Sequence, residues 1–342
     1  MTRHIARIAA AVSVLPLAAA MPAAAQERAP PSGYEAPRTE WGDPDLRGMW
    51  PLEVGRTRMQ RDPKYGEQAW LTDEQYAAAL KAAEAANQGA DKEDKANKLG
   101  AGNWFERGQV LRQTSLIMGP ANGRVPPMTA RGLALAKAMH SSWDNDLFSS
   151  VKDFNSLDRC ITRGMPASMI PFPYNNGVRI FQAPGYVVLN LELIHETRII
   201  PLDGRAAIPG AMKTWLGDSR GHWEGQTLVV ETTNFNGESP MVIVGPSNEP
   251  VPTSPALHVT ERFTPMGPNT IQYEAQVEDP VVLTGPFTIS YPWTRNEDYQ
   301  SFEYACHEGN TLITAYIKAT NPAFAAERAA AVAARESGER KN

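Results

Sequence analysis

From residue 178 onward, apolar and polar side chains alternate in short runs that end at Gly, Pro, Asn or Asp. The clearest run is 270–278, where Ile271, Tyr273 and Val277 alternate with charged or amide side chains. A period of two is typical of a strand with one buried face. Runs of this kind cover 178–182, 186–194, 227–233, 257–264, 270–278, 287–291 and 301–306. They predict a mainly β protein, either an antiparallel β-barrel of the lipocalin or calycin kind or a β-sandwich.

Helical signals lie mainly before residue 150 and after residue 320. Thr72 and Gln75 occupy the two positions of a capping box, and the Ala-rich stretch after them favours a helix that Gly89 ends or kinks. Further helices are expected over 129–140 and 321–335. The expected organisation is an extended leader (26–45), a mostly helical or irregular segment that packs on the barrel (46–150), the β-domain (151–320) and a C-terminal helix or tail (321–342).

The first 25 residues have the pattern of a secretory signal peptide. Arg3 and Arg7 precede an apolar run over 8–20, and Ala23 and Ala25 form a small-x-small cleavage site just before residue 26. The apolar run is shorter than the ~20 residues of a membrane span, and no later run reaches that length. We therefore expect a periplasmic or secreted protein without a membrane span.

The charge balance argues against polyanionic partners. The 342 residues include 33 Lys and Arg against 38 Asp and Glu, a net charge of −5 at pH 7, and the basic residues form no stripe. Nucleic acid is therefore not expected as a partner, whereas a small-molecule ligand is. No Gly-rich phosphate loop or strand–helix–strand rhythm is present, so no nucleotide cofactor is expected. The sequence does not indicate the oligomeric state.

The chain contains two cysteines, Cys160 and Cys306. In an oxidising compartment a lone pair of cysteines is most simply a disulfide. It closes a loop of roughly 146 residues, for which chain entropy gives at most about 4–5 kcal/mol of stabilisation. The alternatives are two buried free thiols, or a reactive or metal-bound thiol.

The first group of candidate residues surrounds His195, near the end of the predicted strand 186–194 and shortly before Arg198. Strand alternation places His195 on the same face as Leu191 and Leu193, which favours a buried histidine of the core. A position at the strand end, where pockets open, favours a catalytic histidine instead. Both interpretations stay open from the sequence.

The second group is the loop 215–225. Trp215 and Trp223 bracket Asp218 and Ser219, which indicates either a pocket wall for an aromatic ligand or a hairpin whose tryptophans pack the core. Ser219 is not part of a G-x-S-x-G motif, so a serine hydrolase is not expected.

The third group is the predicted strand 257–264. Alternation places His258 and Arg262 on one face and Glu261 on the apolar face. A carboxylate among apolar neighbours is costly to bury unless it is paired or protonated. Glu261 is therefore either an acid/base residue with a raised pKa or one half of a buried Glu–Arg or Glu–His pair.

The fourth group is 303–310, where Glu303 and His307 lie at the end of a predicted strand. No metal ion is expected in the leading hypothesis. An alternative divalent-metal site uses His195, His258 and His307, which are ligand types for zinc and related metals. The sequence has no H-E-x-x-H or C-x-x-C motif, and these histidines have no characteristic ligand spacing.

Several of these residues belong to recurring motifs. They follow the patterns C-x-x-x-G-x-P, E/M-x-x-H-x-x-R-x-I-x-x-D-G-R, W-x-G-D/H-S-x-G-x-W-E-G-x-T-L-V-V-x-T, L-H-x-x-E-R-F/Y and E-Y-x-C-x-E-x-N. The matching positions are Cys160, Gly164, Pro166, His195, Arg198, Ile200, Asp203, Gly204, Arg205, Trp215, Gly217, Asp218, Ser219, Gly221, Trp223, Glu224, Gly225, Leu257, His258, Glu261, Arg262, Glu303, Tyr304, Cys306, Glu308 and Asn310.

In these motifs the chain resembles a large family of exported, mostly uncharacterised proteins of proteobacteria and acidobacteria. The resemblance covers about 160–310, and the N-terminal third lies outside it. One departure is Gln226, where the family more often has Asp in a turn. The resemblance implies that a set of His, Glu and Arg side chains recurs within one β-structure, which is more than a fold alone needs, but it brings no settled activity.

The leading hypothesis is an exported enzyme that uses acid/base chemistry, as a lyase, hydratase or isomerase, on a small, partly apolar, aromatic or cyclic molecule. The alternatives are a non-catalytic lipocalin-like binding protein and a metal-dependent hydrolase or oxygenase. The expected catalytic residues are His195, His258, Glu261 and Asp218, and the expected substrate-binding residues are Arg198, Arg262, Ser219, Trp215, Trp223 and Glu303. In this scheme a histidine moves the proton, an acid orients it and an arginine holds an anionic group.

Overall fold

The structure is a computed structural model that describes residues 33–96, 105–142, 147–244 and 249–339. The predicted signal peptide (1–25) lies outside the described residues. The helices are α1 (Asp73–Lys95), α2 (Ala130–Ala138), α3 (Leu312–Thr320) and α4 (Ala325–Glu339). The strands are β1 (Gly48–Met49), β2 (Ile117–Gly119), β3 (Val178–Ala183), β4 (Tyr186–Leu191), β5 (Thr197–Pro201), β6 (Asp218–Glu224), β7 (Thr227–Thr233), β8 (Pro240–Val244), β9 (Glu249–Pro252), β10 (His258–Gly267), β11 (Thr270–Glu278) and β12 (Phe287–Thr294).

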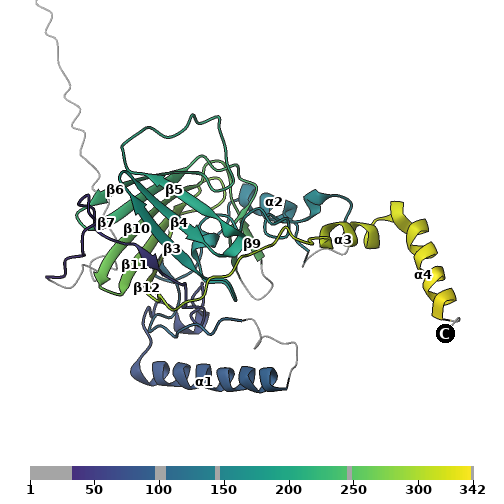
Figure 1. Cartoon of the computed structure of the whole chain (residues 1–342), viewed down its shortest axis with the longest axis horizontal. Coiled ribbons are helices and arrows are strands. Elements are labelled where there is room, and N and C mark those ends of the chain that lie inside the picture. Colours follow the sequence, from purple (N-terminus) through teal and green to yellow (C-terminus); the bar gives the residue numbers. More distant parts are fainter. Residues whose placement is uncertain (1–32, 97–104, 143–146, 245–248, 340–342) are drawn as a thin grey trace, which may run out of the picture.

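The strands form two antiparallel sheets and a separate hairpin. The smaller sheet has the order β1-β3-β4-β5 and the larger sheet the order β2-β12-β11-β10-β7-β6, while β8 pairs with β9. Figure 1 shows β3, β4 and β5 lying across the strands of the larger sheet. Side chains from both sheets share one buried core. The protein is therefore mainly β, with a sandwich-like arrangement.

The described strands do not close into the barrel that the sequence allowed. Closure requires the strands at the two ends of the sheet to be hydrogen-bonded to each other. Here β5 and β6 each end a sheet and lie near each other without forming a ladder. At the opposite ends, β1 and β2 are only two and three residues long. The sandwich alternative fits this arrangement, and the lipocalin-like barrel does not.

The interior is filled by the apolar faces that the alternation predicted. Buried residues alternate with more exposed ones along most of β10 and along the whole of β11. Phe263 pairs with Tyr273 across these strands, and the Trp293 ring packs against both at centroid distances of 5.5 and 5.0 Å. Full burial of such a side chain contributes about 1.5–3 kcal/mol. A slip of one residue would expose this whole face, so the register is strongly specified.

The strand predictions are wrong in two places. The strand expected over 186–194 ends at Leu191, because the chain turns through η6 (Leu193–His195), where Ile194 and His195 have φ angles of 60° and 45°. The strand expected over 301–306 is not formed, since this segment runs irregularly into a turn. Strands β5, β6, β8 and β9 go beyond the predicted set. β6 is polar along most of its length and β9 contains two prolines, so neither shows the alternation of a half-buried strand.

The helices agree more closely with the sequence. Thr72 and Gln75 form the predicted capping box at the start of α1, but the helix continues through Gly89 to Lys95. The helices predicted over 129–140 and 321–335 correspond to α2 and α4, whereas α3 has no counterpart among the predictions. In Figure 1, α1 runs below the sheets, and α3 and α4 extend away from them.

The described part of the leader lies along the β-domain. Gln226 holds it there, because its side-chain amide donates to the Tyr34 carbonyl oxygen at 3.0 Å and its oxygen accepts from the backbone N–H of Ala36. This is the position at which the chain departs from the family pattern. Its side chain ties two distant segments together, beyond the turn that the resemblance implied.

The predicted disulfide is confirmed. Cys160 and Cys306 are bonded, with their Cα atoms 5.6 Å apart. The bond joins the segment before the first sheet to the segment after β12, so it ties the region around His307 to the body of the protein. Among the described residues, no helix is both long enough and apolar enough to cross a membrane.

Candidate functional site

Five of the polar side chains between the two sheets form one buried network. Arg198 on β5 makes a two-pronged ion pair with Glu261 on β10, with Nη1 donating to Oε1 at 2.9 Å and Nη2 to Oε2. The Tyr273 hydroxyl donates to the same carboxylate at 3.0 Å. Nη2 of Arg198 also lies 3.3 Å from the Ser219 hydroxyl and 3.4 Å from that of Thr232. The structure thus brings together three of the predicted residues, Arg198, Ser219 and Glu261.

This network is sealed and its charges are paired. Glu261 is 0% exposed and Arg198 4% exposed. Burial alone would lower the pKa of Arg198, but the Glu261 carboxylate raises it above its ordinary value. Burial and the same carboxylate raise the pKa of Tyr273 well above its usual range. The pattern matches the buried Glu–Arg pair that the sequence offered as one of two interpretations of Glu261.

His258 and Arg262 lie on the opposite, outer face of β10, as the alternation predicted. His258 contacts Glu231, and Arg262 donates to Glu224 at 2.6 Å. These side chains are 37–50% exposed. Because His258 and Glu261 point to opposite faces of one strand, the structure does not bring them together as an acid/base pair.

The segment 215–225 is half loop and half strand. Asp218 accepts from Arg220 at 2.6 Å and from the backbone N–H of Ile208 at 2.9 Å. Arg159 lies over the Trp215 ring at 5.8 Å, and Trp223 packs against the core. The carboxylate of Asp218 therefore ties the preceding loop to β6, and the two tryptophans lie in separate environments.

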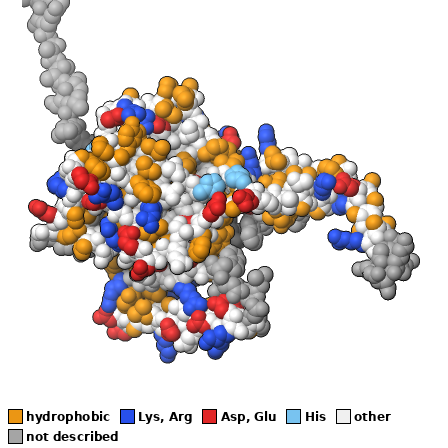
Figure 2. Space-filling model, viewed as in Figure 1, with side chains coloured by type: hydrophobic (Ala, Val, Ile, Leu, Met, Phe, Trp, Pro, Cys, Tyr) orange, Lys and Arg blue, Asp and Glu red, His pale blue; other side chains and the backbone are white. Residues whose placement is uncertain are grey.

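His195 and His307 lie side by side on one face of the protein, with ring centroids 6.0 Å apart. Figure 2 shows such a pair of histidines with acidic side chains next to it. The left-handed turn at Ile194 and His195 breaks the strand alternation, so His195 is exposed and does not share the buried face of Leu193. Positive φ is rare for a β-branched residue such as Ile194, and such strain concentrates at functional sites.

One ring nitrogen of His195 forms a hydrogen bond with the backbone. Nδ1 lies 3.0 Å from the Tyr304 carbonyl oxygen. A carbonyl oxygen only accepts, so Nδ1 carries a proton, and in the neutral imidazole Nε2 is then the acceptor. Tyr304 belongs to the segment that the disulfide at Cys306 anchors. The turn, the disulfide and this hydrogen bond together orient His195.

The three histidines of the alternative metal site do not meet. His258 lies on the outer face of the larger sheet, away from the pair formed by His195 and His307. Within the described ranges, no group of three or more His, Cys, Asp or Glu side chains is arranged to hold a metal ion. Of the two glutamates predicted as site residues, Glu303 is exposed and Glu261 is paired with Arg198.

A cleft that sequence reasoning missed opens beside the histidine pair. It has a volume of about 500 Å³, within the usual range for small-molecule sites. Its walls include Glu106, Tyr174, Glu192, Tyr299 and Phe302. These residues come from four separate segments, none of them a regular strand or helix. We call it the Tyr299 cleft.

Two carboxylates meet at one phenol in the Tyr299 cleft. The Tyr299 hydroxyl oxygen lies 2.7 Å from Glu192 Oε2 and 2.9 Å from Glu106 Oε1. Glu192 also accepts from the Asn175 amide and from the backbone N–H groups of Gly177 and Phe302. Burial, followed by the two carboxylates, raises the pKa of Tyr299 above its ordinary value. Neutral donors therefore hold these acids in place.

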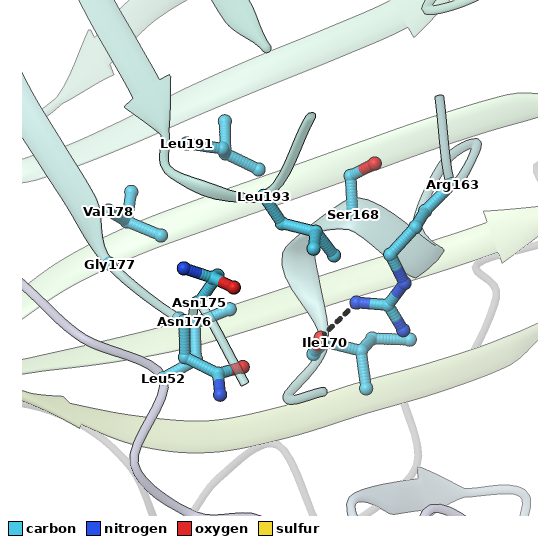
Figure 3. A pocket seen from close by; sticks show the side chains of 10 residues that line it. All are labelled: Leu52, Arg163, Ser168, Ile170, Asn175, Asn176, Gly177, Val178, Leu191 and Leu193. Carbon is cyan, nitrogen blue, oxygen red and sulfur yellow. Dashed lines mark hydrogen bonds between the residues drawn. The ribbon is translucent and has the colours of Figure 1, made fainter. Parts of the chain in front are cut away.

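Two neighbouring hollows share lining residues with the cleft. One, of about 430 Å³, lies between α1 and the loops around Phe105 and Phe172, and it shares Glu106. The other is a water-sized hollow of about 10 Å³ that shares Asn175. In Figure 3 its asparagines face Arg163, whose Nη1 donates to the Ile170 carbonyl oxygen at 2.8 Å.

A second buried acid and base lie next to this small hollow. Burial lowers the pKa of Arg163 to about 10, although the Glu196 carboxylate opposes the shift. Burial raises the pKa of Glu196, although Thr162, Ser168 and Arg163 oppose it. Arg163 also lies over the Phe172 ring at 4.5 Å. Both residues fall within sequence motifs, but at variable positions of them.

No protein family, curated protein or solved structure matches this chain. The geometry of the described residues therefore carries the functional argument.

Proposed function

We propose that this protein is an exported enzyme that performs acid/base chemistry, as a lyase, hydratase or isomerase, on a small, partly apolar cyclic molecule. The substrate binds in the Tyr299 cleft, and His195 is the base. Export is supported by the disulfide between Cys160 and Cys306, since such bonds persist mainly in oxidising compartments. The proposed reaction uses no nucleotide cofactor, because the sequence has no phosphate-binding motif.

The observation that carries the proposal is the fixed tautomer of His195. Its Nδ1–H donates to the Tyr304 carbonyl oxygen, so Nε2 is the proton acceptor of the neutral imidazole. The Tyr304 ring stacks on the ring of Tyr174, which lines the cleft, at a centroid distance of 6.5 Å. Tyr304 thus links His195 to the wall of the ligand site. A histidine base supplies typically 10²–10⁴-fold of rate when it is within hydrogen-bond reach of the substrate or one water away, so the proposal requires the reacting atom to extend from the cleft to Nε2.

A second candidate function is binding without chemistry. It is favoured by the location of His195, which lies on the exposed face next to the cleft and is not one of the residues that line it. In that case the cleft holds a ligand whose orientation depends on the carboxylates and aromatic rings alone.

The test is a turnover screen of the mature protein against small cyclic compounds, followed by His195→Ala. We expect this variant to lower kcat/KM by about 10²–10⁴-fold with an unchanged unfolding midpoint. His222→Ala is the matched control, because His222 is an exposed histidine on the outer face of β6. Turnover that survives His195→Ala, or that is lost instead in His258→Ala, contradicts the assignment of the base.

A further inference from the structure

The charge of the Tyr299 cleft is not neutralised by the protein. Among the described residues, no Lys or Arg nitrogen lies within 4.0 Å of the carboxylates of Glu106 or Glu192. Glu192 is only 4% exposed. A nearly buried carboxylate is ordinarily paired with a cation or a metal ion. Glu261 satisfies that requirement through Arg198, whereas Glu192 has only neutral donors.

The donors around the two acids are all neutral, since Glu106 accepts from the backbone N–H and the amide of Asn176, and the phenol between the acids supplies one proton for two contacts. Tyr299 has a single hydroxyl proton, which can serve only one of the two carboxylate oxygens at a time. The other oxygen then meets the phenol oxygen with no proton between them. A ligand that brings positive charge and N–H donors to this point would satisfy both acids.

The remaining walls suit an organic cation better than a bare ion. Tyr174, Tyr299 and Phe302 contribute aromatic rings to the cleft, and Phe302 is 66% exposed. Aromatic faces attract ammonium groups through their quadrupoles. A bare metal ion would instead need a close cluster of oxygen ligands, and the described residues hold no such group.

The adjoining hollow fixes the direction in which such a ligand would lie. Arg56 and Arg107 line that hollow together with Phe105 and Phe172. Arg107 is paired there with Asp91 and Asp94, so Arg56 supplies the repulsion, and an ammonium group is attracted to the end with Glu106 and Glu192. The cleft volume of about 500 Å³ accommodates one ring and a short amine.

We infer that the Tyr299 cleft binds a small aromatic or cyclic amine in its ammonium form, with the positive charge on the cleft side of Glu106 and Glu192 and the ring against Tyr174 and Phe302. This replaces the anionic substrate group expected from Arg198 and Arg262, neither of which lines the described hollows. The inference rests on the proposed function only in taking the same cleft as the ligand site.

The experiment is calorimetric titration of the mature protein with benzylamine, benzyl alcohol and benzoate, which share a ring and differ in charge. We expect benzylamine to bind about tenfold or more tightly than benzyl alcohol, and benzoate to bind most weakly. Binding of the alcohol or of benzoate as tight as that of the amine overturns the inference, and so does an absence of binding by the amine.

The matched variants are Glu106→Gln and Asp298→Asn. Both remove one negative charge, but Asp298 is exposed next to Tyr299 and does not line the cleft. We expect Glu106→Gln to weaken benzylamine binding about tenfold or more and Asp298→Asn to change it less than about twofold. Equal weakening by both variants shows a general charge effect and contradicts a site. If Glu106→Gln does not fold, the comparison of the three probes on the wild-type protein still decides.

Binding and turnover fail independently. His195→Ala removes the proposed base but none of the residues that line the cleft, so it is expected to keep its affinity for benzylamine. A protein that binds the amine and turns over nothing supports this inference and contradicts the enzyme. A protein that turns over a cyclic compound but binds benzylamine, benzyl alcohol and benzoate equally well supports the enzyme and contradicts this inference.

Discussion

The interior network around Glu261 and the cleft around Glu192 use the same hydrogen bond in opposite settings. In both, a tyrosine hydroxyl donates to a nearly buried glutamate, Tyr273 to Glu261 and Tyr299 to Glu192. In the interior, Arg198 neutralises the carboxylate and the two sheets exclude water. In the cleft, neutral donors hold the carboxylate and one side is open.

The difference shows which acid is available for a ligand. A paired and sealed carboxylate has its charge satisfied within the fold, and removing its partner mainly costs stability. A carboxylate that neutral donors hold at the wall of a cleft has no cation to offset its negative charge. It therefore attracts a positively charged ligand that enters the cleft. The residues of the interior network are thus candidates for folding, and Glu106, Glu192 and Tyr299 of the cleft are candidates for binding.

Arg198→Met gives the largest expected effect, because it leaves Glu261 buried without a cation. We expect it to lower the free energy of unfolding by about 3–5 kcal/mol in denaturant titrations. The control is Arg198→Met combined with Glu261→Leu, which removes both charges and should recover most of the loss. A single variant as stable as the wild type would show that the interior network carries no charge pair.

Glu196→Gln should have an intermediate, pH-dependent effect. Burial raises the folded-state pKa of Glu196 above the ordinary value of 4.5. Below 4.5 the carboxyl is protonated in both states. As pH rises through the raised pKa, the folded wild type loses stability relative to the unfolded chain, by about 1.4 kcal/mol for each pH unit that separates the folded-state and unfolded-state pKa values. The variant does not titrate, so its stability relative to the wild type should increase over this range. Parallel stability curves from pH 4 to 8 would contradict a raised pKa.

Arg262→Ala should have the smallest effect. Arg262 lies on the same strand as Glu261, β10, but on its outer face. There it pairs with Glu224 of β6. Exposed ion pairs contribute about 0–1 kcal/mol, so the unfolding midpoint should hardly move. A cost comparable with that of Arg198→Met would mean that this outer face is covered, and the contrast between buried and exposed pairs would then fail.

Much of the β architecture is readable from local patterns. The alternation over 257–263 correctly separates His258 and Arg262 from Glu261, because a strand turns each successive side chain to the opposite face. The capping box at Thr72 and the pairing of the two cysteines are likewise confirmed. Each of these depends on neighbouring residues or on a choice between only two cysteines.

The errors arise where the chain leaves a regular period. The sequence predicts one strand over 186–194 with His195 at its end, but a left-handed turn at Ile194 resets the alternation and exposes the histidine. The barrel alternative is likewise wrong, since closure needs a ladder between β5 and β6, and these described strands do not form one. Their side-chain pattern does not say whether they pair.

The sequence by itself determined which residues face the interior of the larger sheet and that the two cysteines pair. Only the tertiary structure decided that Glu106, Glu192 and Tyr299 meet, because they are separated by 86 or more positions and lie in segments without a regular period. Periodicity is a property of neighbouring residues. A cleft is set by how distant loops pack once the sheets have formed.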